Sequence, residues 1–128
     1  MSPNSLNKLG LIGYGLVAYH YFHHINNNIS KIIFIGYFLL AISYLTENIY
    51  SHNIKTIGIM ILEIYYCIQL LSSSDISYIV PLSGYILYSY ENKMGKLILI
   101  GYYLSKFKSN DISLVAGSIG LTVLYALH

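Results

Sequence analysis

Glu63 is the side chain whose position says most about chemistry in this sequence. It lies near the centre of the apolar segment Ile54–Leu71, whereas the other charged residues lie between apolar segments or close to the ends of one. A charged group at the centre of a lipid-embedded helix costs about 2.5–3.5 kcal/mol on insertion scales. No cation lies at helical spacing from Glu63 on its own segment. Two interpretations follow: a proton or cation carrier, or a neutral acid that hydrogen-bonds to a tyrosine of a neighbouring helix.

Pro81, Ser83 and Gly84 predict an interruption inside a later apolar segment. Proline removes one helical hydrogen bond, and glycine and serine nearby permit a kink or an exposed carbonyl. Broken helices coordinate ions in transporters, although a packing kink is the more common outcome. Together with Glu63 and Tyr66, which share one helix face, these residues are the candidates for proton or solute binding.

A His-x-x-His-His cluster, formed by His20, His23 and His24, predicts a possible set of metal ligands. Histidines at this spacing share one helix face and can bind Zn²⁺ or iron. The spacing is similar to one histidine box of membrane fatty-acid desaturases and hydroxylases, a resemblance that covers five residues. Those enzymes need several such boxes, whereas His52 and His128 stand alone here. The ligand count therefore falls short of that family, and we expect no cofactor. Three histidines are enough only for an incomplete zinc site. The alternative is an interfacial cluster favoured by the helix C-terminal dipole.

The composition predicts a membrane protein. Of 128 residues, 55% are hydrophobic and 9% are charged, against roughly 25% charged in an ordinary soluble domain. Arginine is absent and the lysines are dispersed, so we expect no nucleic-acid partner. Cys67 is the only cysteine, which excludes an intrachain disulfide.

Six apolar segments follow one another with short polar connectors. They are Leu6–Phe22, Ile32–Thr46, Ile54–Leu71, Ile76–Tyr90, Met94–Phe107 and Ile112–Leu127. Serine, asparagine and aspartate before the fourth and sixth segments, at Ser72–Asp75 and Ser109–Asp111, predict helix N-caps. Glu47 begins the connector after the second segment. We therefore predict an all-α, polytopic integral membrane bundle of about six short transmembrane helices, forming one domain over residues 1–128. Met94–Phe107 is the weakest span, and a re-entrant segment there would leave five.

The pattern Lys-x-x-x-Ile-Gly-Tyr-x-Leu occurs three times, at Lys8–Leu16, Lys31–Leu39 and Lys96–Leu104. The repeat predicts two inverted three-helix halves, 1–72 and 73–128. An equally weighted interpretation is a chance match in a sequence that uses few residue types. With six spans, four lysines lie on one side and three on the other, so the positive-inside rule predicts no orientation.

Small residues on several segments predict close helix packing, within the bundle or between copies. They are Gly13, Gly36, Gly101, Ser113, Ala116, Gly117 and Gly120.

These features support three functional hypotheses. The first is a small channel or carrier for protons, cations or a small solute, built around Glu63. The second is a structural or assembly subunit of a membrane complex or virion membrane. The third, a lipid-modifying membrane enzyme that uses the histidines, ranks last because no motif predicts catalysis. The expected partners are the lipid bilayer and either further copies of the chain or a membrane complex.

Overall fold

The computed structural model describes residues 3–45 and 50–127, and six α-helices make up most of them. They are α1 (Pro3–Phe22), α2 (Asn28–Ser43), α3 (Tyr50–Ser73), α4 (Ile79–Ser89), α5 (Lys93–Ser105) and α6 (Ile112–Leu127). Two short 3₁₀ turns, η1 (Ile76–Tyr78) and η2 (Lys106–Lys108), precede α4 and follow α5. The described residues contain no strand, so the prediction of an all-α bundle with six helices is confirmed. Thr46, Glu47 and His128 lie outside the described residues.

Polar side chains mark where several helices begin. The Asn27 side chain accepts a hydrogen bond from the Ser30 amide at 2.9 Å, and the Ser30 hydroxyl accepts one from the Asn27 amide at 3.2 Å. Asp75 caps η1 and Asp111 accepts from the first amides of α6. These bonds satisfy amides that have no partner within the helix. The two N-caps predicted from the sequence are therefore confirmed.

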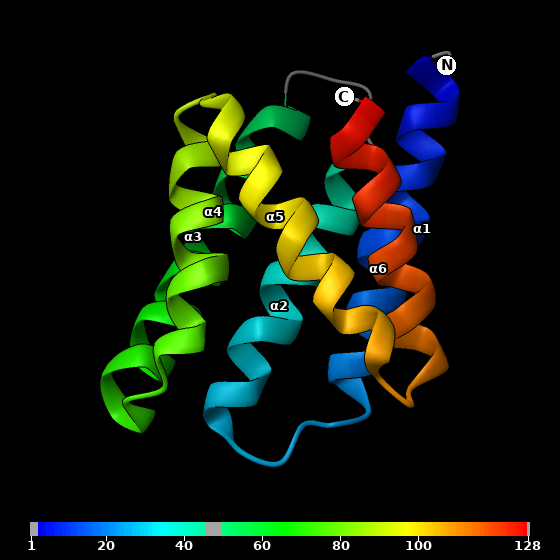
Figure 1. Ribbon diagram of the computed structural model, residues 1–128. Coiled ribbons are helices and arrows are strands. Elements are labelled where there is room, and N and C mark those ends of the chain that lie inside the picture. Colours follow the sequence, from blue (N-terminus) through cyan, green and yellow to red (C-terminus); the bar gives the residue numbers. More distant parts are fainter. Residues whose placement is uncertain (1–2, 46–49, 128) are drawn as a thin grey trace.

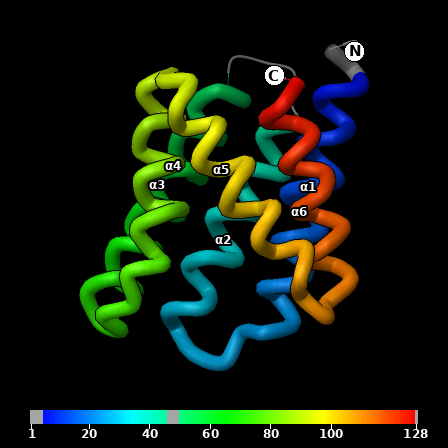
Figure 2. The backbone as a smooth tube through the Cα atoms, in the orientation of Figure 1, coloured from blue at the N-terminus to red at the C-terminus, as the bar shows by residue number. Residues whose placement is uncertain are grey.

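The helices form a closed ring. Each packs against its neighbours in chain order, and α1 packs against α6 to close the circle (Figure 1). Successive helices run in opposite directions, so the two chain ends and the α4–α5 turn lie at one end of the bundle (Figure 2). The α1–α2 connection and the turn before α6 lie at the other end.

Tyrosine side chains fill the centre of this ring. Each of the six helices contributes one tyrosine that is at most 2% exposed. In helix order they are Tyr14, Tyr37, Tyr66, Tyr85, Tyr103 and Tyr125. Their rings contact one another across the bundle, for example Tyr103 and Tyr125 with centroids 6.1 Å apart. The core is therefore both aromatic and polar.

The tyrosine hydroxyls bond to one another. Tyr37 contacts Tyr66 at 3.1 Å and Tyr103 at 2.7 Å, and Tyr103 also bonds to Tyr85. These contacts join α2, α3, α4 and α5 across the bundle interior. A further hydroxyl pair, Tyr14 and Tyr125, joins α1 to α6. A buried hydroxyl without a partner is costly, so this network ties the helix positions to one another.

Glycine allows the helices to approach closely enough for these bonds. A Cβ added to Gly36 of α2 would overlap the Leu62 side chain of α3, and one on Gly58 would crowd the Gly36 carbonyl at 3.1 Å. Leu62 therefore fills the space that a larger residue at position 36 would occupy. Tyr37 directly follows Gly36, and Tyr66 lies one helical turn after Leu62, so both core tyrosines lie next to this contact.

Two other helix pairs repeat this arrangement. Gly13 of α1 faces Leu121 of α6, and Gly84 of α4 faces Leu99 of α5. In α3, α5 and α6 a glycine, a leucine and a core tyrosine follow at four-residue spacing. The three sets are Gly58, Leu62, Tyr66; Gly95, Leu99, Tyr103; and Gly117, Leu121, Tyr125. This spacing keeps all three residues on one helix face.

The predicted packing residues lie in different surroundings. Gly117 and Gly120 face Val17 and Gly13 of α1, while Ser113 and Ala116 are half-buried on α6. Gly101 is exposed, and nothing lies within 4 Å of a Cβ built on it. The division into two inverted halves stays a prediction.

One helix among the described residues, α3, is both long and apolar enough to cross a membrane alone. Three further apolar stretches, Asn28–Ser43, Ile76–Ser89 and Ile112–Leu127, are shorter. A helix of sixteen residues is about 24 Å long, against about 30 Å for the hydrocarbon core of a typical bilayer.

Gly95→Ala tests the close contact between α4 and α5. A Cβ there overlaps the backbone of Tyr88, which cannot move aside as a side chain can. We expect a loss of about 1–3 kcal/mol in the free energy of unfolding, measured by thermal or denaturant unfolding of the purified protein. Gly101→Ala is the control, and we expect it to be neutral or to stabilise by up to about 1 kcal/mol through helix propensity. Equal effects of the two variants would contradict the packing account.

Tyr103→Phe tests the hydroxyl network. The change keeps the ring but removes the group that serves both Tyr37 and Tyr85. We expect a loss of about 1–3 kcal/mol in stability because a buried hydroxyl loses its partner. Tyr90→Phe, at a position 80% exposed, should leave the unfolding midpoint unchanged. A neutral Tyr103→Phe would show that the network contributes nothing net to folding.

Candidate functional site

A pocket of about 590 Å³ lies between α3, α4 and α5, beside the α4–α5 turn. Most of its wall is one face of α3, and the rest comes from the end of α4, the turn and the first turn of α5. The lining residues are His52, Lys55, Thr56, Ile59, Met60, Glu63, Tyr88, Ser89, Tyr90, Glu91 and Lys96.

Glu63 is the lining residue of α3 that lies farthest from the helix start. It is half-buried, and its Oε1 is shielded without a hydrogen-bond partner among the described residues. Ser89 of α4 lines the same pocket and is the polar side chain that interacts with the Glu63 carboxyl group. The Ser89 hydroxyl also lies 2.7 Å from the Ile86 carbonyl.

Charges of both signs border the pocket. The Lys55 ammonium lies 5.2 Å from the centre of the Tyr44 ring and 5.7 Å from that of Tyr88. Such cation–π contacts hold the lysine ammonium group beside these rings. Lys96 and Glu91 complete the charged rim. The pocket therefore presents both carboxyl and amine groups.

The other residues predicted to act with Glu63 lie elsewhere. Tyr66 belongs to the hydroxyl network of the core. Ser83 donates to the Val80 carbonyl at 3.1 Å, and Gly84 packs against α5. None of these, nor Pro81, lines the pocket with Glu63.

Pro81 lies in the first turn of α4 and is buried. The prediction placed an interruption within a helix, but α4 begins only two residues before Pro81, after η1 and the Asp75 cap. Amides in a first helical turn have no partner in their own helix, so proline is tolerated there. Pro81 therefore lies at the start of α4 and does not interrupt a helix.

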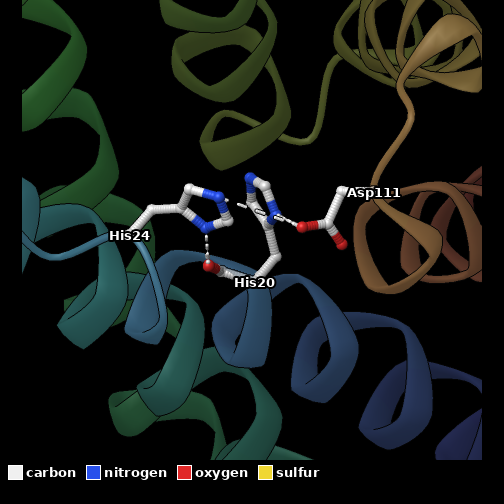
Figure 3. Close-up of side chains that lie close together, drawn as sticks. All are labelled: His20, His24 and Asp111. Carbon is white, nitrogen blue, oxygen red and sulfur yellow. Dashed lines mark hydrogen bonds and ion pairs between the residues drawn. The ribbon is translucent and has the colours of Figure 1, made fainter.

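A second polar group lies at the opposite end of the bundle, where α1 ends and α6 begins. His20 Nδ1 is 2.9 Å from Asp111 Oδ2, and His24 Nε2 is 4.0 Å from the same oxygen. Figure 3 shows the two imidazole rings and the carboxylate directed toward one another. One ligand atom from each residue lies within 4.8 Å of the others. The short contact of His20 with Asp111 is an ion pair without the alignment of a hydrogen bond, and His20 Nδ1 makes no hydrogen bond to the described residues.

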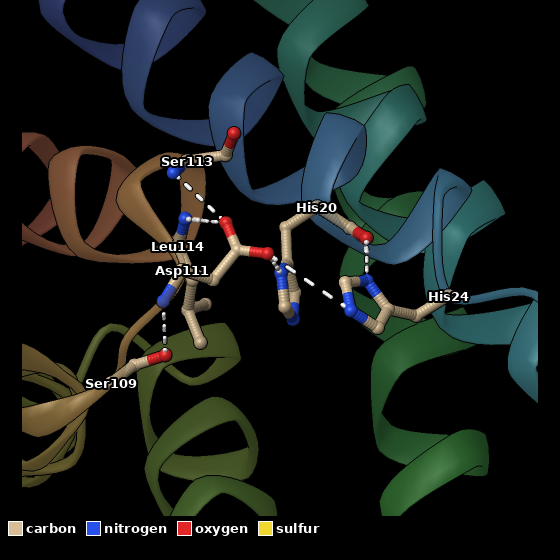
Figure 4. Close-up of polar contacts among 6 residues, drawn as sticks. All are labelled: His20, His24, Ser109, Asp111, Ser113 and Leu114. Atoms are coloured by element: carbon tan, nitrogen blue, oxygen red, sulfur yellow. Dashed lines mark hydrogen bonds and ion pairs between the residues drawn. The ribbon is translucent and has the colours of Figure 1, made fainter.

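Other bonds orient two of these side chains (Figure 4). His24 Nδ1 donates to the His20 carbonyl at 2.7 Å, which leaves the lone pair of a neutral imidazole on Nε2. Asp111 Oδ1 accepts from the amides of Ser113 and Leu114, at 2.9 and 3.3 Å, so Oδ2 is free to face the histidines. Its contact with His20, and after it these amides, lower the pKa of Asp111.

His23 does not join this group. Its ring contacts the Tyr19 ring, with centroids 4.3 Å apart, and the side chain is exposed. The histidine face predicted from the sequence thus contains His20 and His24 only. Asp111 is the member that sequence reasoning missed, because its only visible signal was a helix N-cap and nothing in the sequence brings it next to α1.

No protein-family model matches this chain, and no curated protein or solved structure is significantly similar to it. The chemistry of the protein is therefore inferred from its own side chains.

Proposed function

We propose that this protein is a small multi-pass membrane protein that binds and carries a proton, a cation or a small solute at Glu63. The surface of the bundle supports the membrane location. Large apolar side chains on the outside of every helix are at least a third exposed, where a soluble bundle would place polar residues. They include Ile12, Ile35, Phe38, Ile57, Ile64, Ile79, Leu97, Leu104, Ile119 and Val123.

Helix α3 also supports the membrane location. It has 24 residues, and only 22% of its most apolar window is buried within the chain. The core helix of a soluble protein would be mostly buried, so the apolar surface of α3 needs another apolar environment. The shorter helices fit a thin bilayer, with lysines and tyrosines at their ends reaching the interface.

The pocket at Glu63 is the observation on which the proposed transport depends. It combines a shielded, partnerless carboxyl oxygen with a solvent-reachable cavity, and an ionisable group in such a place is a functional candidate. In the described part of the chain, one buried tyrosine from each helix occupies the centre of the bundle. We therefore favour binding and release of a proton or small cation over continuous flow through one chain.

The filled core also favours an alternative, a structural or assembly subunit without transport. In that case the exposed apolar helix faces would contact other copies or a larger membrane complex, and the pocket would have no part in flux.

Cys67 tests the membrane location. It is exposed on α3, about 8 Å along the helix from its middle, and so lies within the hydrocarbon of a spanning bundle. In liposomes we expect slow labelling by a charged maleimide until detergent is added. A cysteine at the exposed connector position, in the Cys67→Ser, Asn110→Cys variant, should label rapidly without detergent. Equally rapid labelling of Cys67 would contradict the proposed location.

Glu63→Gln tests the carrier. Purified protein in liposomes should dissipate an imposed proton or sodium gradient, and we expect Glu63→Gln to abolish this flux because the amide has no titratable proton and no negative charge to hold a cation. Glu91→Gln changes an acid at the rim of the same pocket and should retain the flux.

The possible results separate the two functions. Wild-type flux that survives Glu63→Gln would exclude Glu63 as the carrier group. Wild-type liposomes no leakier than empty ones would exclude transport of these ions and favour the assembly role.

A further inference from the structure

We propose that His20, His24 and Asp111 form a binding site for a divalent metal ion of the zinc class. Two imidazoles and a carboxylate are a ligand set that Zn²⁺ uses in proteins. His20 lies in the last turn of α1, His24 lies two residues after that helix, and Asp111 directly precedes α6. The three side chains converge on one point (Figure 3). The site lies at the opposite end of the bundle from the Glu63 pocket and is independent of it.

The distances suit a zinc ion after a small adjustment. Ligand atoms about 2.0–2.2 Å from a tetrahedral ion lie about 3.3–3.6 Å from one another. The observed separations from Asp111 Oδ2 are 2.9 Å for His20 and 4.0 Å for His24, and all three ligand atoms lie within 4.8 Å of one another. His24 is 56% exposed and lies two residues beyond the end of α1, so a small shift of this residue together with its ring would shorten the longer separation.

The ligands are held by other bonds, as in established metal sites. A metal-binding histidine commonly donates its second N–H to a carbonyl or carboxylate, which fixes the tautomer and the ring direction. His24 makes this bond to the His20 carbonyl. Asp111 uses one oxygen for the α6 amides and keeps the other for the histidines (Figure 4). Both ligands therefore present the correct atom before any ion arrives.

The exposure of the site allows an ion to enter. The side chains of His20 and Asp111 are 13% and 31% exposed, so one side of the cluster reaches solvent. Water would supply the fourth ligand, as it does in zinc sites with three protein ligands. A bound ion would join the first helix to the last, at the place where the ring of helices closes.

Zinc binding to the untagged protein, purified with a chelator and then dialysed against Zn²⁺, tests the site. Elemental analysis of the wild type should give about one equivalent of zinc. His24→Ala and Asp111→Asn should each weaken zinc binding by at least about tenfold, and asparagine preserves the N-cap of α6. His23→Ala, a histidine one residue from the site and outside it, should bind zinc like the wild type.

The unfolding temperature supplies a second measurement. Zinc should raise the midpoint of the wild type and of His23→Ala, but not that of His24→Ala, because an ion that binds only the folded chain stabilises it. Ca²⁺, which prefers oxygen ligands, should not replace zinc. The proposal is overturned if the wild type binds no more zinc than a His20→Ala, His24→Ala double variant. Loss of zinc in His23→Ala to the same extent as in His24→Ala would overturn it as well.

Discussion

The hydroxyl groups of the buried tyrosines need partners inside the protein, and the rest of the bundle depends on that requirement. Water cannot reach the centre, so each unpaired hydroxyl would cost free energy comparable to a lost hydrogen bond. Every helix brings one tyrosine there, and the partners come from other helices. A helix that shifted along its axis would break these pairs. The network therefore selects one register for six helices whose apolar surfaces alone would accept several.

Close approach of the backbones makes the network possible. Three helix pairs place a glycine opposite a leucine, and the tyrosines that follow these residues extend to the centre. The tyrosine rings then fill the space along the bundle axis, so the chemistry that remains available lies at the ends. One end carries the pocket with Glu63, and the other carries His20, His24 and Asp111. A rigid, closed core thus separates two polar sites that use different residue types.

The helices were largely predictable, whereas the candidate sites were not. The apolar segment Ile112–Leu127 coincides with α6, and Ile54–Leu71 lies within α3, because an uninterrupted apolar run bounded by caps is a local property. Pro81 was misplaced because a proline in the first turn of a helix and one in its middle have the same sequence signature until the helix start is known. Glu63 was recognised from its isolation in an apolar segment, but its neighbour Ser89 was not.

The sequence by itself determined where the helices lie, which residues cap them and that their surfaces are apolar, since each of these follows from residues within a few positions of one another. Tertiary structure alone decided which tyrosines are central, which glycines contact a neighbour and which side chains share a site. Asp111 illustrates the difference. Its capping role is visible in the residues around it. Its position beside His20 and His24 exists only because α1 and α6 pack side by side and run in opposite directions. Contacts between the two ends of a chain depend on how the ring of helices closes, and local residue patterns do not contain that information.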